Sequence, residues 1–201
     1  MLVTQFNPML QAQARPVHLY MEANPNPNSL KFVANFMLVE EGISYDFPDA
    51  GSAESSQLAK ELFNFAAVQR VFIASNFVTI TKSDEVEWAE VQTIFRDHIR
   101  QYLESGKKAV QVVVTKDPLF DANDSEIVKK IKGILDEYIR PAVEQDGGAI
   151  VFHSFSDGVV KVLLQGSCSG CPSSTVTLKA GIQNLLTRML PEVKEVQAEG
   201  V

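Results

Sequence analysis

The sequence of 201 residues contains few cysteines and no long apolar segment. It has two cysteines and three histidines. No apolar run approaches the roughly 20 residues that a membrane-spanning helix needs. A secreted fold held together by disulfides would carry more cysteines at wider spacings, so that class is excluded. We also expect no membrane span and no membrane partner.

The chain has no basic face that stands out. Its formal net charge is −7, and nucleic-acid binding rests largely on neutralising phosphates with lysine and arginine. We therefore expect no nucleic-acid partner. With 45% hydrophobic and 21% charged residues, the composition is that of an ordinary globular protein.

The beginning of the chain contains no recognisable targeting signal. Residues 1–17 hold one arginine and no acidic residue, and they lack the basic start, apolar centre and cleavage site of a secretory signal. A transit peptide would normally be richer in arginine and serine. We expect a bacterial-type cytoplasmic protein, with an organellar matrix as the less favoured alternative, and we leave the role of residues 1–16 open.

Residues 17–105 are expected to form a first small domain. The turn Asn24–Asn28 is rigid because both of its prolines fix their own φ and keep the preceding residue out of the helical region. The apolar pattern predicts a hairpin, a helix, a second hairpin and a closing helix, at residues 17–35, 55–65, 68–81 and 88–103. We place a linker at 106–123, in which the valines of 110–114 fit either an edge strand or an extended connection.

Residues 124–201 are expected to form a second small domain. The predicted order is a helix that Pro141 should kink or end, two strands around Ser156–Gly158, a helix from Pro172 and a short last strand. The fold class is therefore α+β, with two small domains. The C-terminal domain is expected to be a helix-strand-strand-helix-strand two-layer sandwich.

The two cysteines, Cys168 and Cys171, lie three positions apart in a glycine-rich loop between a strand and a helix. Gly166 and Gly170 allow this loop to bend sharply and approach a bulky ligand. Pro172 suits the first position of the following helix. The N–H groups at that helix start favour anions and should lower the pKa of both thiols. The arrangement points to metal binding or thiol redox chemistry in a reducing compartment.

Two thiolates make an incomplete metal site. Zinc and iron–sulfur clusters usually require four protein ligands. The three histidines, His18, His98 and His153, do not fill the gap convincingly. A two-fold dimer would complete the site, because a C2 axis brings identical loops together.

The cysteine pair has three other interpretations. A thioredoxin-like thiol–disulfide oxidoreductase also carries Cys-x-x-Cys at a helix start, but the 30 residues after Cys171 are too few for the remaining strands of that fold. A zinc-bridged structural dimer has the same ligand requirement and stays open. Two incidental cysteines would more often be scattered on apolar faces.

The motifs resemble the NifU-like (Nfu-type) iron–sulfur scaffold and carrier proteins. In the back part, the resemblance rests on Arg140-Pro141, on Asp146-Gly147-Gly148 and above all on GSCSGCPSS over residues 166–174. In the front part it rests on residues 24–32 and 71–73, and it resembles the Nfu N-terminal domain. The chain departs from the family at Gln57, where the family usually has proline, and residues 1–16 match nothing identifiable.

The resemblance implies a non-enzymatic scaffold or carrier with no catalytic residues. Cys168 and Cys171 would be the metal ligands. The cofactor would be a [4Fe–4S] cluster shared by two chains, with [2Fe–2S] as the other possibility. The partners would be a second copy of the chain, apo iron–sulfur proteins and upstream assembly factors. The front domain would then be a docking module.

Overall fold

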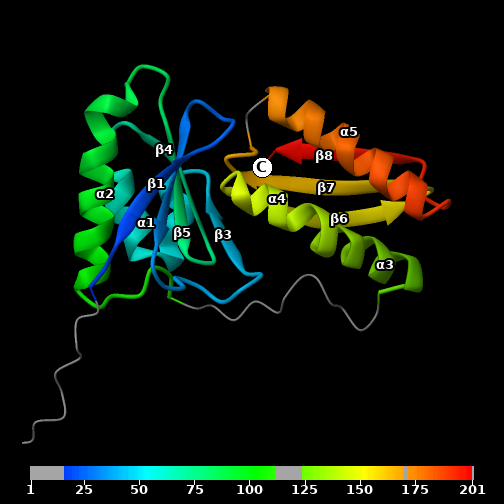
Figure 1. Cartoon of the computed structure of the whole chain (residues 1–201), viewed down its shortest axis with the longest axis horizontal. Helices are drawn as coiled ribbons and strands as arrows, with labels where there is room; N and C mark the ends of the chain where they lie inside the picture. Colours follow the sequence, from blue (N-terminus) through cyan, green and yellow to red (C-terminus); the bar gives the residue numbers. More distant parts are fainter. Residues whose placement is uncertain (1–15, 112–123, 170–171, 201) are drawn as a thin grey trace, which may run out of the picture.

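The structure, a computed structural model, describes residues 16–111, 124–169 and 172–200. The described chain forms two units, each built on its own β-sheet (Figure 1). We call residues 16–111 the front unit and residues 124–200 the back unit. Much of the predicted linker lies outside the described residues, so the predicted domain boundaries stay a prediction. Within that linker, Ala109 and Val110 pack into the core of the front unit.

The front unit is a five-stranded antiparallel sheet with two helices against one face. The strand order is β1-β2-β5-β4-β3. Its elements are β1 (Leu19–Ala23), β2 (Ser29–Ala34), β3 (Ser44–Phe47), a 3-10 helix η1 (Ala50–Ser55), α1 (Gln57–Phe63), β4 (Val68–Ala74), β5 (Phe77–Lys82) and α2 (Trp88–Glu104).

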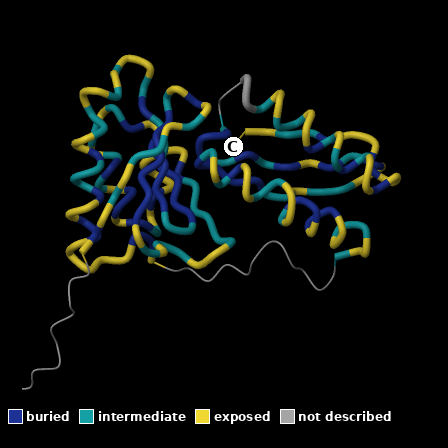
Figure 2. The backbone as a smooth tube through the Cα atoms, in the orientation of Figure 1, coloured by how far each residue is buried: buried dark blue, intermediate teal, exposed yellow. Residues whose placement is uncertain are grey.

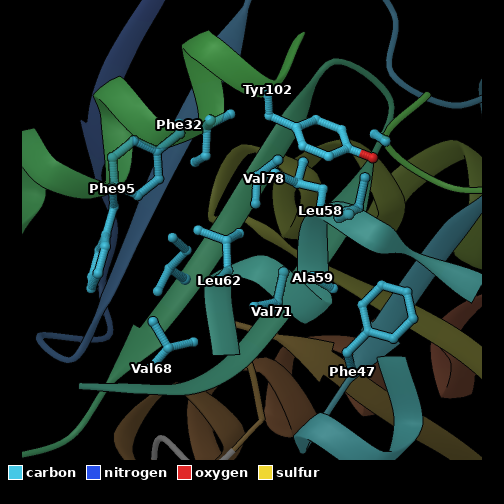
Figure 3. Close-up of a cluster of buried hydrophobic side chains, with 14 of the residues drawn as sticks. Phe32, Phe47, Leu58, Ala59, Leu62, Val68, Val71, Val78, Phe95 and Tyr102 are labelled. Atoms are coloured by element: carbon cyan, nitrogen blue, oxygen red, sulfur yellow. The ribbon is translucent and has the colours of Figure 1, made fainter. Parts of the chain in front are cut away.

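The core of the front unit lies between the sheet and the helices α1 and α2 (Figure 3). Fully burying one large apolar side chain stabilises a fold by roughly 1.5–3 kcal/mol, so this layer is the main source of the unit's stability. Its fully buried side chains include Phe32, Leu58, Leu62, Ile73, Ile80, Phe95 and Ile99.

The predicted strands and helices of the front unit are confirmed, but one strand was missed. β3 has only four residues, Ser44–Phe47, and pairs with β4. Its sequence SYDF alternates polar and apolar residues, but four residues are too few for this pattern to identify a strand. Asp46 is accommodated because Arg70 on β4 lies 2.6 Å from it.

The back unit has the predicted order of elements. Its three-stranded sheet has the order β6-β7-β8, with β7 and β8 parallel. Buried side chains on one face of β7 share a core with the helices of this unit. The elements are α3 (Glu126–Ile134), a π-helical turn η2 (Leu135–Ile139), α4 (Arg140–Gln145), β6 (Gly148–Ser156), β7 (Val159–Gly166), α5 (Pro172–Met189) and β8 (Glu195–Gly200). The α+β class and the two-layer arrangement are thus confirmed.

Pro141 does not end the helical segment of the back unit; the helix changes its register just before this residue. The chain forms the π-helical turn η2 directly before it, and α4 then begins at Arg140 with Pro141 in its first turn. Proline has no N–H to donate to the preceding turn, and a local change of helical register accommodates that loss.

Among the described residues, no helix combines the length and apolar character of a membrane span.

The second face of the front sheet is apolar too, and the back unit covers it. Successive side chains of a strand point to opposite faces. All six residues of the central strand β2 are buried, so both faces of the sheet are covered there. In Figure 2 the end of the back unit that adjoins the front sheet is largely buried. The side chains gathered here are Val33, Phe72, Ala74 and Phe77 of the front unit and Ala149 of β6.

Candidate functional site

The predicted ligand loop follows β7 and begins at Gly166. Its described part ends at Ser169; Gly170 and Cys171 lie outside the described residues. Gly166 has φ of +63°, a left-handed conformation that glycine adopts without strain. A Cβ at this position would lie 2.8 Å from the Phe72 ring and 2.9 Å from the Gly147 carbonyl oxygen. The predicted role of Gly166 in bending the loop is therefore supported, and the residue also allows a close approach to the front unit.

The loop is tied to the turn that precedes β6. Ser167 Oγ donates a hydrogen bond to the Asp146 carbonyl oxygen, and the Ser167 N–H donates to the Gly147 carbonyl oxygen at 3.3 Å. A Cβ at Gly148 would lie 2.8 Å from Cys168 Sγ. The two motifs, Asp146-Gly147-Gly148 and the cysteine loop, therefore form one site although about 20 residues separate them.

Cys168 is buried, with only 4% of its surface exposed to water. Its Sγ lies 3.9 Å from Ser167 Oγ, and the side chain belongs to the core cluster of the back unit. The residue also lines a hollow of about 340 Å³ between α4, α5 and the front unit. The other residues that line this hollow are Pro25, Asn26, Ala142, Val143, Asp146, Ser167, Thr177 and Leu178.

α5 begins at Pro172, directly after the loop, as predicted. The start of a helix presents N–H groups and the positive end of the helix dipole. A lowered thiol pKa at Cys168 and Cys171 stays a prediction on this basis.

The histidines do not supply the missing ligands within the described chain. His98 lies on α2 of the front unit, where Nε2 is 3.4 Å from Glu61 Oε2. His153 is exposed on β6, and His18 precedes β1. Among the described residues, no group of three or more His, Cys, Asp or Glu side chains could hold a metal ion. A metal bound at Cys168 would therefore need ligands from outside the described residues of this chain.

Two front-unit residues beside the loop were missed by sequence reasoning. Asn26 Nδ2 donates a hydrogen bond of 3.0 Å to the Ser167 carbonyl oxygen. Asp46 lies against the first residue of the loop, since the Gly166 N–H acts on its carboxylate. Burial raises the pKa of Asp46 from 3.8 to about 6, although Arg70 and the Gly166 N–H both act to lower that pKa. The only available signal was the rigid turn Asn24–Asn28, which by itself suggests no partner.

Both units match known protein families. Residues 19–106 match the family described as "Scaffold protein Nfu/NifU N terminal", and residues 131–197 match the "NifU-like domain". NifU-like protein 4, mitochondrial, from Arabidopsis thaliana is 42% identical over 195 residues, which cover 94% of this chain and 69% of that protein. NifU-like protein 5, mitochondrial, from the same organism is 43% identical over 192 residues, covering 93% and 70%.

The NFU1 iron-sulfur cluster scaffold homolog, mitochondrial, from Drosophila willistoni is 42% identical over 190 residues, covering 94% of this chain and 66% of that protein. The chain belongs to the Nfu family of iron–sulfur cluster scaffold proteins. The resemblance drawn from the motifs is thus confirmed. This Nfu chain spans about two thirds of the length of the relatives named here.

The expected bacterial-type cytoplasmic location is wrong, because these Nfu relatives are named as mitochondrial proteins. The expectation rested on the low arginine and serine content of residues 1–17 and on the absence of a secretory signal. A low arginine and serine content is a compositional signal only, and it does not decide the compartment.

Proposed function

We propose that this Nfu protein is a non-enzymatic carrier that binds an iron–sulfur cluster between two copies of the chain and transfers it to apo-proteins. Cys168 and Cys171 of each copy would be the four ligands. The cluster would be [4Fe–4S], which four thiolates can hold. The names of the relatives support an organellar matrix as its place of work.

The placement of Cys168 is the observation that carries this proposal. The residue lies at the base of the loop, lines a hollow and is followed by the start of α5. In the part of the chain that the structure describes, no group of three or more His, Cys, Asp or Glu side chains could hold a metal ion. A site with two thiolates per chain becomes complete when a two-fold axis brings a second loop to the first. The cluster would then be shared, and separation of the copies would expose it for transfer.

No observation favours the two alternatives, a thiol–disulfide oxidoreductase and a zinc-bridged dimer. One experiment separates all three. The protein is loaded anaerobically with iron and sulfide, and its metal content, sulfide content and mass in solution are measured. We expect about four irons and four sulfides per dimer, with a visible chromophore. A colourless dimer with tightly held zinc, or insulin reduction by metal-free protein, would contradict the proposal.

The ligands are tested with Cys168→Ala and Cys171→Ala, each of which should abolish stable cluster binding and the dimer that depends on it. Ser156→Ala, at the exposed hairpin of the back unit, is the control and should load like the wild type. Removal of the cluster with a chelator should return the wild type to the mass of its apo form. Transfer is tested separately: the loaded protein should activate an apo-enzyme faster than free iron and sulfide do.

A further inference from the structure

The front unit contacts the part of the back unit that carries the cysteine loop. Hydrogen bonds cross between the units around the apolar contact of Phe72 and Phe77 with Ala149. They join Asn26 Nδ2 to Ser167 O at 3.0 Å, Lys31 Nζ to Gln145 O at 3.3 Å, Ser44 Oγ to Gln165 Oε1 at 3.3 Å and Arg140 Nη1 to Gly42 O at 3.2 Å. Three of these four bonds reach the back unit at Gln145, Gln165 and Ser167, which lie in or next to the cysteine loop and the turn before β6.

Hydrogen bonds within its own turn hold Asn26 in a fixed orientation. Its Oδ1 accepts the Asn28 N–H at 3.0 Å, and its own N–H donates to Asn24 Oδ1 at 3.1 Å. The prolines on either side restrict the same backbone. The residue is 7% exposed, so its Nδ2 would be left without a partner if the contact were lost. The carbonyl that it binds belongs to the peptide group joining Ser167 to Cys168.

The back unit approaches the front sheet with backbone where a side chain would not fit. A Cβ at Gly147 would lie 2.8 Å from Thr79 Oγ1, on the second face of β5, and 3.5 Å from Asn24 Nδ2. The corresponding contact at Gly166 is with the Phe72 ring. These two glycines lie close together, since a Cβ at Gly166 would lie 2.9 Å from the Gly147 carbonyl oxygen. One is in the turn before β6 and the other is at the start of the loop that carries Cys168.

We infer that the front unit forms part of the cluster site: Asn26 and the second face of the front sheet position the loop that carries Cys168. Asn26 is a positioning residue, because it acts on Cys168 through the Ser167 carbonyl. This inference rests on the proposed function, and it gives the front unit a role in holding the cluster in addition to any docking of partners. A residue that orients a metal ligand typically changes metal affinity about 10–100-fold when it is removed.

Two variants of the full chain remove this support in different ways. Asn26→Asp keeps the Oδ1 that accepts the Asn28 N–H, and it replaces the donor to Ser167 with a carboxylate oxygen that cannot donate and that repels the Ser167 carbonyl. Thr79→Lys places a charge on the second face of the sheet, away from the helix-side core, and should separate the units without unfolding the front one. The controls are Asn35→Asp and Thr93→Lys, the same changes at exposed positions of the front unit.

The first measurement uses metal-free, reduced protein, so it stands independently of cluster binding. The rate of iodoacetamide modification at Cys168 is followed by peptide mass spectrometry. Modification of the wild type should be slow because Cys168 is nearly buried. Asn26→Asp should react severalfold faster and Thr79→Lys faster still, while the control variants should match the wild type. Circular dichroism in the far ultraviolet confirms that each variant is folded.

The second measurement uses anaerobically loaded protein. Both variants should lose their cluster to a chelator about tenfold faster than the wild type or more, with a changed visible circular dichroism spectrum. Unchanged loss rates and spectra in both variants would overturn the inference, even if Cys168 became more reactive, because docking would then cover the loop without positioning it. A wild type that takes up no cluster would instead refute the proposed function, and the reactivity of Cys168 would still report on the contact.

Discussion

The Asn26 side chain and the Ser167 carbonyl lie 141 positions apart in the sequence and are joined by a buried hydrogen bond of 3.0 Å. This contact links a proline-restricted turn of one unit to the peptide bond before the candidate ligand of the other. A change that weakens the contact between the two units should therefore also destabilise the loop that carries Cys168.

Gly148→Ala should displace the loop. The added Cβ would lie 2.5 Å from the Gln165 carbonyl oxygen and 2.8 Å from Cys168 Sγ, and such overpacking typically costs about 1–3 kcal/mol. We expect a loss of this size in the free energy of unfolding in urea, together with weaker cluster binding. Gly133→Ala is the matched control: it lies in α3 with nothing within 4 Å of the added Cβ. That change should stabilise the protein by about 0.5–1 kcal/mol.

Gly166→Ala tests whether the contact with Phe72 adds to backbone strain. Gly166 and Gly106 both have positive φ, +63° and +75°, so alanine costs roughly 1–2 kcal/mol at either position. Only Gly166 meets neighbouring atoms, since a Cβ at Gly106 has nothing within 4 Å. Gly166→Ala should therefore lower the melting temperature clearly more than Gly106→Ala. Equal losses would mean that the Phe72 ring moves aside freely.

The carboxyl of Asp46 should make stability depend on pH. Its pKa is about 6 in the folded protein against 3.8 ordinarily, so between about pH 4 and 6 the folded state binds more protons than the unfolded state. The contribution of Asp46 to stability is then greatest below about pH 4 and is lost as pH rises through about 6, by roughly 1–3 kcal/mol.

This pH dependence is measured as the difference in unfolding free energy between the wild type and Asp46→Asn from pH 4 to 8. An asparagine can still accept a hydrogen bond from Arg70. The stability of the wild type relative to the variant should fall as pH rises through this window. Asp157→Asn, at the exposed turn between β6 and β7, should keep the pH profile of the wild type. A constant difference for Asp46→Asn would rule out the raised pKa.

Ser56→Ala should destabilise the front unit. Ser56 is fully buried, its Oγ accepts the Ala59 N–H at 3.0 Å at the start of α1, and it donates to the Ala109 carbonyl oxygen at 2.6 Å. Losing a helix cap costs about 1 kcal/mol, and the Ala109 carbonyl would lose a buried partner. We expect a loss of about 1–3 kcal/mol in thermal unfolding. Ser125→Ala, an exposed cap of α3 with a longer contact of 3.4 Å, should cost less.

Elements with a clear apolar period were predictable from the sequence. The stripe from Trp88 to Leu103 corresponds to α2, and the strands on either side of Ser75-Asn76 and of Asp157-Gly158 correspond to β4–β7. β3 was not predicted because its four residues are held by pairing with β4 and by the contact of Asp46 with Arg70. The π-helical turn before Pro141 was not predicted either, since its register change leaves no mark in the apolar pattern.

The candidate site was only partly predictable. The spacing of Cys168 and Cys171 and the neighbouring glycines identified the loop, because metal ligands are chemically distinctive and close in sequence. Asn26 and Asp46 were not found, because an amide or a carboxylate that supports a loop from another unit has no local pattern. The burial of β2 and β5 on both faces was not predicted, because these strands mix apolar residues with polar ones such as Lys31 and Thr79 and give no sign that a second unit covers the second face of the sheet.

That second face determines how the two halves of the chain should behave when they are separated. A fragment that ends within 112–123 would expose Val33, Phe72, Ala74 and Phe77 together on one side of a sheet. Such an apolar patch in water favours self-association, so the front half alone should form oligomers or aggregate at concentrations at which the whole protein stays dispersed.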